Sequence, residues 1–204
     1  FSVGMKPSYR MYDMMNSQEH MRFSRELWED RDSYNQNIQP IGYAGLIQKL
    51  QKKEITQQQF EQEYRKMENM NTDWFDILFR NSFSHVHNIS ISAQGEKVSS
   101  RFSIGINSTK GEAKGNDMLT LTANSNTTFR LDERLIIDLQ LNGTYRETKD
   151  FAFGVSPYEY ALNTARDIPA YNEDGSLYYY EKAGATSYSI PDKVAYNYNI
   201  LNER

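Results

Sequence analysis

The chain has 204 residues, with 23 Lys and Arg against 27 Asp and Glu, and its formal net charge at pH 7 is -4. A nucleic-acid-binding module usually shows a basic excess, and no long run of like charge occurs here, so we expect no nucleic-acid partner. The absence of Cys excludes disulfide scaffolds, thiolate zinc sites and cysteine nucleophiles. Because aromatic residues make up 13% of the chain, we do not expect disorder over the whole length.

Two features of the chain bear on a membrane location. No stretch approaches the roughly 18 apolar residues that a membrane-spanning helix needs. A membrane-spanning strand needs only about 9 to 11 residues that are apolar at alternate positions, so spanning by strands remains open. The chain begins at Phe1, without an initiator Met or a signal-peptide pattern, and we expect it to be a processed product or a fragment of a longer protein.

The composition changes near residue 85. Residues before this point are rich in Met, Gln, Glu and Arg, and residues after it alternate Ser, Thr and Asn with β-branched residues. The first pattern favours helix and the second favours strand. We therefore predict a mainly β fold with an α-helical insertion. Residues 1–84 form a helix-containing segment, residues 85–150 form antiparallel strands, and residues 151–204 form a Tyr-rich segment of the same domain.

Three helices are predicted in the first segment. Asn16 with Glu19 makes a capping box that starts a helix over residues 17–28, and a second short helix is predicted over residues 43–52. Thr56 and Gln59 make another capping box, which predicts a helix over residues 57–67. This third helix carries one narrow apolar stripe, formed by Phe60, Tyr64 and Met67.

Strict alternation of apolar and polar residues predicts the strands. It is clearest from residue 135 to residue 145, and the same period occurs at residues 89–93, 102–107 and 119–124, with residues 127–130 extending the third strand. Every predicted strand therefore has one apolar and one polar face. We expect an antiparallel meander of four or five strands in this part of the chain.

The predicted connections alternate between short and long. Residues 94–97 and 131–133 are tight turns, whereas residues 110–117 and the segment after residue 150 are longer. This asymmetry is typical of outer-membrane barrels, which have short periplasmic turns and long outer loops. A soluble antiparallel sandwich would give the same alternation of faces. The Ser, Thr, Asn and Gln residues on the polar face favour a hydrated barrel interior.

The chain contains the motif Asn71-Thr72-Asp73-Trp74 and further distinctive segments at residues 6–9, 14–19, 87–92, 115–117, 158–161 and 164–171. Together these segments resemble the early barrel region of the SusC/RagA family of TonB-linked (TonB-dependent) outer-membrane transporters, and the Asn-Thr-Asp-Trp motif is the most specific of them. The resemblance covers nearly the whole chain. It identifies the chain as an early barrel fragment that lacks the plug domain.

The resemblance implies a fold and a set of partners. It implies a large transmembrane β-barrel in the cell outer membrane, surrounded by outer-membrane lipid, with residues 1–84 as the first outer loop and residues 151–204 as the third. It also implies a nutrient importer energised by TonB through the missing plug region, with a SusD-like surface lipoprotein that captures a glycan or peptide ligand. We expect the isolated fragment to be inert.

A second hypothesis remains open beside the transporter. The chain could be a self-contained soluble β-rich module that binds carbohydrate or peptide through its Tyr-rich segment. This alternative predicts that the apolar positions of the last strand are buried under another layer of the same chain. The positions concerned are Leu135, Ile137, Leu139 and Leu141.

The candidate ligand-binding residues lie in the Tyr-rich segment, around a hairpin turn predicted at residues 172–176. A Tyr ring offers a flat apolar face and a hydroxyl, which suits stacking on a sugar or holding a protein partner. The alternative is that these rings form the segment's own small core or an interfacial aromatic girdle. The candidates are Tyr158, Tyr160, Tyr171, Tyr178 and Tyr179, with further tyrosines at 180, 188, 196 and 198.

The sequence gives little reason to expect catalysis, a cofactor or a metal. No Ser-His-Asp order, carboxylate pair or phosphate-binding Gly-rich loop stands out, so we expect no enzyme activity and assign no catalytic residue. His85 and His87 share a strand face but have no third ligand at a fitting spacing. The acidic segment 30–35 lacks the Gly and the distal Glu of a calcium loop.

Overall fold

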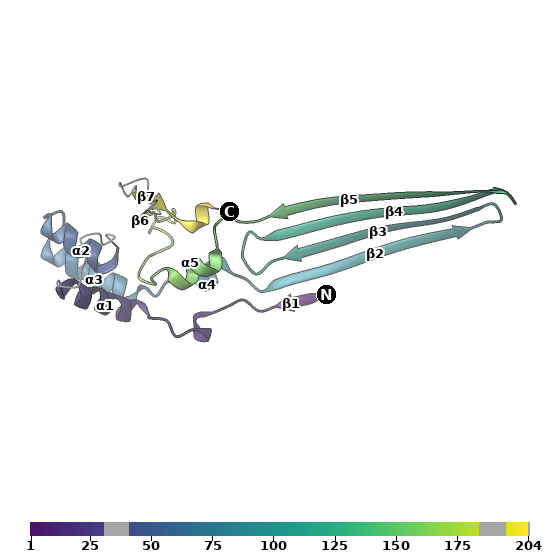
Figure 1. Ribbon diagram of the computed structural model, residues 1–204. Helices are drawn as coiled ribbons and strands as arrows, with labels where there is room; N and C mark the ends of the chain where they lie inside the picture. Colours follow the sequence, from purple (N-terminus) through teal and green to yellow (C-terminus); the bar gives the residue numbers. More distant parts are fainter. Residues whose placement is uncertain (31–40, 184–194, 204) are drawn as a thin grey trace. The chain divides into compact units, whose positions relative to one another are not determined.

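The computed structural model describes residues 1–30, 41–183 and 195–203 (Figure 1). The chain divides into two compact units. Unit 1 comprises Phe1–Lys6 and Phe79–Phe151, and unit 2 comprises Pro7–Leu78 and Ala152–Arg204. The predicted helix-containing segment 1–84 therefore contributes to both units.

Unit 1 is a five-stranded antiparallel sheet with the strand order β1-β2-β3-β4-β5. The strands β2 to β5 follow one another in the sheet as they do in the sequence, which confirms the predicted antiparallel meander (Figure 1). The described sheet is not closed, because β1 and β5 each pair along one side only. The strands are β1 (Ser2–Gly4), β2 (Ser82–Gln94), β3 (Val98–Lys110), β4 (Asp117–Asp132) and β5 (Leu135–Lys149).

The four strands predicted from alternation are all present, and each is longer than its pattern. The β2 strand begins at Ser82 although the alternation starts only at residue 89, because backbone pairing continues through His85, whose partner is Ser108. The β1 strand was not predicted. Its three residues are too few to show a period, and its partner in β2 is distant in sequence, with Val3 paired to Phe83.

The connections have the predicted asymmetry. Residues 95–97 join β2 to β3 and residues 133–134 join β4 to β5 at one end of the sheet, and residues 111–116 join β3 to β4 at the other. The longer connection is held by Arg80, which donates from its backbone N–H to the Glu112 carbonyl at 2.8 Å. The Arg80 guanidinium also forms an ion pair with Asp117 at the start of β4.

Unit 2 contains the helices and a two-stranded hairpin. The predicted capping box of Asn16 and Glu19 is present at the start of α1, with both hydrogen bonds at 2.9 Å. The helices are α1 (Ser17–Glu29), α2 (Gly42–Gln51), α3 (Gln57–Met70), α4 (Trp74–Leu78) and α5 (Pro157–Asn163). Single 3-10 turns lie at Tyr9–Met11 and Ile200–Asn202, and β6 (Tyr180–Ala183) pairs with β7 (Ala195–Tyr198).

The α3 helix is specified at both of its ends. Thr56 and Gln59 form the predicted capping box, in which the Gln59 N–H donates to Thr56 Oγ1 at 3.2 Å. The helix continues three residues past its predicted end and stops at Asn71, whose φ is 48°. Asn71 and the buried Ser17 exchange two hydrogen bonds, at 3.0 and 2.9 Å, which tie the end of α3 to the start of α1.

A small core joins α1, α2 and α3. Its buried members are Met21, Tyr43 and Leu46. The predicted apolar stripe of α3 packs against this cluster, which confirms that the stripe has a partner within the chain. Trp28, Ile47 and Ile55 pack on the same cluster. Among the described helices, none has both the length and the apolar character required to cross a membrane.

The capping box of α3 gives a first prediction. Replacing Thr56 by Ala removes the acceptor for the Gln59 N–H and should destabilise the first turn by about 1 kcal/mol, or about fivefold faster amide exchange there. Hydrogen–deuterium exchange of the α3 amides measures this effect. T56S keeps the hydroxyl and should exchange like the original chain, and unchanged exchange in T56A would contradict the assigned role of the cap.

Candidate functional site

One face of the unit 1 sheet is apolar and exposed. Directly paired residues on neighbouring strands share a face, and the register brings apolar residues together in rows across the sheet. One row runs Ile89, Ile104 and Ala123, and the next runs His87, Ile106, Leu121 and Tyr145. Leu119 and Phe129 on this face are half-buried. The large apolar side chains of β2 to β5 that are between 37% and 70% exposed on this face are Phe83, Ile89, Ile91, Val98, Phe102, Ile104, Ile106, Leu121, Ile137, Leu139, Leu141 and Tyr145.

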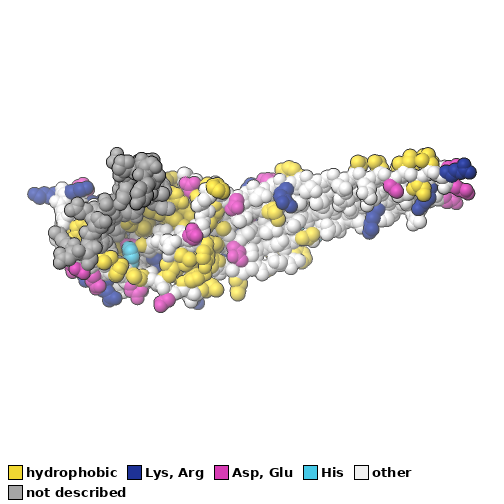
Figure 2. Space-filling model, viewed as in Figure 1, with side chains coloured by type: hydrophobic (Ala, Val, Ile, Leu, Met, Phe, Trp, Pro, Cys, Tyr) yellow, Lys and Arg dark blue, Asp and Glu magenta, His cyan; other side chains and the backbone are white. Residues whose placement is uncertain are grey.

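The opposite face carries mainly hydroxyl and amide side chains. The face of the sheet visible in Figure 2 is mostly white, the colour of uncharged polar side chains and backbone. These groups pair across the strands, as in the bond from Asn124 Nδ2 to Ser103 Oγ at 3.5 Å and the bond from Thr128 Oγ1 to Asp138 Oδ1 at 2.5 Å. The sheet therefore presents two surfaces of opposite polarity, as a strand set between lipid and water requires.

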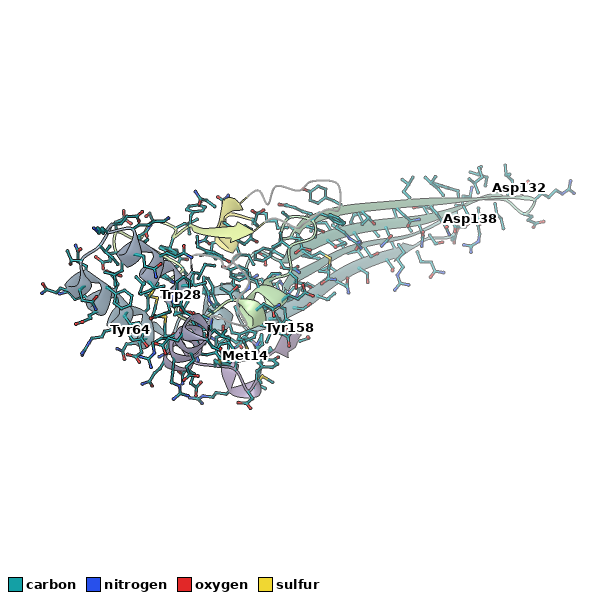
Figure 3. The ribbon with its side chains drawn as sticks, turned by 60° about the vertical axis from the view of Figure 1, so that its left-hand side comes forward. Met14, Trp28, Tyr64, Asp132, Asp138 and Tyr158 are labelled. Atoms are coloured by element: carbon teal, nitrogen blue, oxygen red, sulfur yellow. The ribbon has the colours of Figure 1, made fainter. Side chains whose placement is uncertain are left out.

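Charged residues limit the apolar surface at both ends of the strands. Lys110 pairs with Asp117, and Asp117 pairs with Lys149, in one row whose member on β2 is Phe83. The other end carries Glu133 and Arg134 in the turn after Asp132 (Figure 3). Between these ends the apolar alternation of β5 runs over residues 135–145, which matches the about 9 to 11 residues of a membrane-spanning strand.

His85 and His87 lie on the apolar face, near the start of β2. Their ring centroids are 5.2 Å apart, and Phe83 continues the row with its centroid 5.5 Å from that of His85. In the described part of the chain no group of three or more His, Cys, Asp or Glu side chains could hold a metal ion. The two histidines form part of an aromatic row.

Tyr160 belongs to the core of unit 2. It is 7% exposed, and its ring meets that of Trp74 edge to face with the centroids 5.1 Å apart. Its hydroxyl accepts a hydrogen bond from the Tyr180 hydroxyl at 3.0 Å. Burial raises the pKa of Tyr160 far above its ordinary value. Tyr160 thus has the core role that was one of the two alternatives for these rings.

Tyr158 lies two residues before Tyr160, at the border of a separate aromatic cluster. It is 40% exposed, and its hydroxyl is 2.6 Å from the Tyr12 hydroxyl. The Tyr12 ring is stacked on Phe75 at 5.4 Å, and Tyr9 meets Phe75 edge to face at 4.8 Å. Sequence reasoning missed Tyr9, Tyr12 and Phe75 as neighbours of Tyr158, because nothing local links segments so far apart.

Tyr171, Tyr178 and Tyr179 flank the predicted turn, which is present. The Asn172 N–H donates to the Ser176 carbonyl at 2.8 Å, and Gly175 adopts a φ of 82°, which favours glycine. Tyr171 is 49% exposed and Tyr179 is 45% exposed, whereas Tyr178 is half-buried, and burial raises its pKa. Ligand binding by the five tyrosines stays a prediction.

Two predictions from the sequence concern residues that lie partly outside the described ranges. Tyr188 and the side chain of Tyr196 are not described, nor are residues 31–35 of the acidic segment. Of the remaining tyrosines, Tyr180 and Tyr198 lie in the hairpin, with their ring centroids 6.3 Å apart. The described tyrosines of the last quarter therefore include both packed and exposed rings.

Hydrogen bonds in unit 2 join two of the sequence motifs, residues 71–74 and residues 164–171. The Thr72 N–H donates to the Arg166 carbonyl at 2.8 Å, and Thr72 Oγ1 donates to the Ile168 carbonyl at 2.8 Å. Trp74 Nε1 donates to the Ala165 carbonyl at 3.3 Å. Thr72 and Trp74 of the Asn-Thr-Asp-Trp motif therefore position the segment that leads to Tyr171, through hydrogen bonds to its backbone carbonyl groups.

Arg166 adds a second contact to this junction. Its guanidinium carbon lies 4.4 Å from the centroid of the Tyr9 ring, a cation–π arrangement. The Tyr9 hydroxyl donates to the Ala161 carbonyl at 2.9 Å. Burial raises the pKa of Tyr9 to about 12, and the nearby guanidinium acts in the opposite direction. Tyr9 is therefore a neutral structural hydrogen-bond donor.

A buried ion pair, also missed from the sequence, joins α1 to the same segment. Asp167 is 0% exposed, and its Oδ1 lies 3.0 Å from His20 Nδ1. The nearby Asp167 carboxylate raises the pKa of His20 above its ordinary value, and burial of His20 opposes this. Gly42 has a φ of 59°, and a Cβ there would lie 2.8 Å from Asp167 Oδ2. Only glycine fits this approach without displacement.

Comparison with known proteins places the chain near a TonB-dependent receptor. No family model matches the chain. The chain is similar to the TonB-dependent receptor P26 of Formosa agariphila, with 28% identity over 121 residues. The match covers 59% of this chain and 12% of that protein. The chain thus corresponds to a small part of a distantly related TonB-dependent receptor.

The two exposure classes of tyrosine give a second prediction. Y160A should lower the free energy of unfolding by about 3 to 5 kcal/mol, the range for large buried aromatic residues, because it empties a site beside Trp74. Y171A removes an exposed ring and should change it by less than about 0.5 kcal/mol. Urea denaturation of the two variants measures the difference, and equal stabilities would contradict the core assignment of Tyr160.

The pair of His20 and Asp167 gives a third prediction, with a definite sign. The pKa of His20 is higher in the folded chain than its ordinary value of 6.5. The pair therefore stabilises the fold fully below that value, and the stabilisation is lost as pH rises through the folded pKa. Urea midpoints between about pH 5.5 and 8.5 should fall with rising pH by this contribution.

The matched variants isolate that contribution. D167N should flatten the decline and should move the imidazole titration of His20, followed by NMR, back towards 6.5. D13N changes an exposed carboxylate and should leave both unchanged. A His20 titration that is the same with and without the Asp167 carboxylate would show that the pair does not act in this way.

Proposed function

We propose that the chain is a strand-bearing part of an outer-membrane TonB-dependent nutrient importer of the SusC/RagA type. The observation that carries the proposal is the exposed apolar face of the sheet, with charged residues at both ends of its strands. The similarity to a TonB-dependent receptor supports the same function. The role is transport without catalysis.

The apolar face requires an environment other than water. Leaving a large aliphatic or aromatic side chain exposed forgoes about 1.5 to 3 kcal/mol relative to burying it, and the sheet exposes such side chains on all of its four long strands. Lipid would cover this face and leave the polar face towards a hydrated interior. The surface pattern therefore fits outer-membrane lipid as the neighbour of the sheet.

The sheet edges support membership of a larger barrel. The β5 strand pairs with β4 only, so one whole edge of its backbone lacks hydrogen-bond partners within the described sheet. Unpaired backbone groups are strongly disfavoured inside a bilayer. Further strands must therefore pair with β5 and with the free part of β2 before the sheet can span a membrane, and the isolated chain is expected to be inert.

The partners follow from the proposed family. A plug region would contact TonB, and a SusD-like surface lipoprotein would deliver a glycan or a peptide. The exposed rings of Tyr158, Tyr171 and Tyr179 remain the candidates for ligand contact among the five predicted tyrosines. Tyr160 is the least suited to it, because its ring and hydroxyl are already engaged in the core.

The soluble-module alternative predicts burial of the apolar positions of β5. Leu135, Ile137, Leu139 and Leu141 are instead between 45% and 58% exposed. The helices that could have supplied a cover use their own apolar stripe on the Met21 cluster. The alternative therefore has no support from the arrangement of the described residues.

Single spin labels provide the test of the membrane proposal. The chain has no Cys, and L139C and Q140C are made in the complete gene after any Cys elsewhere in it has been replaced by Ser, so that each protein expressed in its host carries one unique label. Residues 139 and 140 are adjacent in β5 and lie on opposite faces. In outer membranes the label at 139 should be accessible to oxygen dissolved in lipid, and the label at 140 to a water-soluble nickel chelate.

Other outcomes of this experiment would contradict the proposal. If both labels meet the nickel chelate equally, the apolar face does not contact lipid. Recovery of the protein in the soluble fraction, with the label at 139 shielded from both reagents, would favour the soluble module. Both comparisons use the same strand, so differences in expression level do not affect them.

A further inference from the structure

A buried carboxylate connects the segment at residues 164–171 to two helices of unit 2. Asp167 is 0% exposed, and its Oδ1 lies 3.0 Å from Nδ1 of His20 on α1. Its Oδ2 lies beside Gly42, the first residue of α2, because a Cβ on Gly42 would be 2.8 Å from that oxygen. Apart from the contact with His20, neither oxygen has a hydrogen-bond partner within the described residues. We refer to His20, Gly42 and Asp167 as the Asp167 cluster.

Two positive groups compensate the buried charge of Asp167. An ionised carboxylate is costly to bury unless a partner offsets its charge. The N-terminus of α2 is one partner, since the helix dipole places partial positive charge there and the N-cap residue Ile41 forms no side-chain hydrogen bond. The imidazole of His20 is the other partner, and it is positive only when it is protonated. The charge balance of the cluster therefore depends on one proton.

His20 is the single histidine of unit 2, because His85 and His87 both lie in β2 of unit 1. Imidazole is the side chain whose ordinary pKa places its change of charge between pH 5 and 8. The Asp167 carboxylate raises the pKa of His20 above 6.5, and burial opposes this. The side chain is 32% exposed, so water reaches it. His20 can therefore exchange its proton with solvent in the folded chain.

Other titratable groups lie on the elements that pack around the cluster. Carboxylates, guanidinium groups and phenols ordinarily titrate outside the range from pH 5 to 8. Burial raises the pKa of Tyr178 further from that range, and the charges of Glu63 and Asp167 act in the same direction. His20 is therefore the group that changes its charge near neutral pH. The surrounding groups are Glu19 and Arg22 on α1, Tyr43 on α2, Glu63 on α3, Arg166 on the segment itself, and Tyr178.

We infer that the Asp167 cluster is a pH-sensitive switch that controls a local opening at the start of α2. With His20 protonated, Asp167 holds α1 and the start of α2 together. When His20 is neutral, the buried carboxylate has lost one of its two positive partners, and the start of α2 moves away so that water solvates the carboxylate. The switch is closed in acid and opens as the pH rises.

The opening is local because the other contacts of the cluster involve no group that titrates near neutral pH. Asp167 stays in place, since the backbone carbonyl groups of its neighbours Arg166 and Ile168 both accept hydrogen bonds from Thr72. The α1 helix stays packed through Met21, which is buried in the core that α1 shares with α2 and α3. The start of α2 is therefore the part that moves.

The start of α2 is weakly held and borders a groove. Its first helical hydrogen bond, from the Gly45 N–H to the Ile41 carbonyl, is long at 3.4 Å. The next residue after Gly42 is Tyr43, whose ring meets those of Phe60 and Tyr64 edge on, with both centroid distances at 6.0 Å. These three rings line a groove of about 640 Å³ among the helices. The switch would therefore change the shape of this groove with pH.

Hydrogen–deuterium exchange on the product of the complete gene separates a local opening from global unfolding. Peptides covering residues 41–50 and, as a reference, residues 60–70 of α3 are followed at about pH 6 and about pH 8.5 in increasing sub-denaturing urea. The intrinsic pH dependence of amide exchange is divided out. Protection of the reference should show the steep urea dependence of global unfolding.

Residues 41–50 should lose protection at the higher pH. Protonated His20 stabilises the closed form below 6.5, and this stabilisation is lost as the pH rises through the folded pKa. The loss should reach about tenfold for each unit by which the folded pKa exceeds the ordinary value. It should depend only weakly on urea, because a local opening exposes little surface.

Three variants assign the effect to the cluster. H20Q removes the titrating group and should keep residues 41–50 at the low protection of the higher pH under both conditions. D167N removes the charge that His20 compensates and should abolish the pH dependence. D13N changes an exposed carboxylate before α1 and should leave the pH dependence as it is.

Three outcomes would overturn the inference. They are equal protection of residues 41–50 at the two pH values, a loss with the full urea dependence of the reference, and a pH dependence that persists in H20Q. The second outcome would show that the pair acts on global stability alone. If D167N does not fold, H20Q decides, since this side chain is partly exposed. The inference concerns unit 2 and does not rest on the proposed function, so either can fail without the other.

Discussion

The arrangement of unit 2 depends on hydrogen bonds between Thr72 and the segment around Arg166, residues 94 positions apart in the chain. The Thr72 backbone and hydroxyl and the Trp74 indole all donate to carbonyl groups of residues 165–168. Arg166 returns a bond of 3.3 Å from its guanidinium to the Thr72 carbonyl. Because these bonds are made largely to backbone, they fix the path of the later segment whatever its neighbouring side chains are.

Several other features follow from that junction. The Trp74 ring, held by its indole bond, supports Tyr160, and Asp167 is placed where it meets His20. The same path brings Ala170 to Asn199, whose side-chain amide donates to the carbonyl groups of Ala170 at 3.0 Å and Tyr178 at 2.7 Å. Tyr171 and Tyr179 are left exposed at the turn. The hydrogen bonds between Thr72, Trp74 and residues 165–168 thus lie between the packed Tyr160 and the exposed Tyr171 and Tyr179 along the chain path.

Features with a local cause were predictable from the sequence, and features with a distant cause were not. The capping boxes at Asn16 and Thr56 and the alternation in β5 involve residues a few positions apart, and the structure has all of them. The β1 strand and the pair of His20 with Asp167 join segments that no local pattern connects.

The two units differ in whether they bury their large apolar side chains. Unit 2 buries Met21, Trp74, Phe75, Leu78 and Ile200 completely, so its stability depends on contacts that the chain itself supplies. The long strands of unit 1 instead direct their apolar positions outward, and neighbouring strands are held mainly by backbone pairing. The same alternating residues thus set the register of the strands and leave one face of the sheet apolar and exposed.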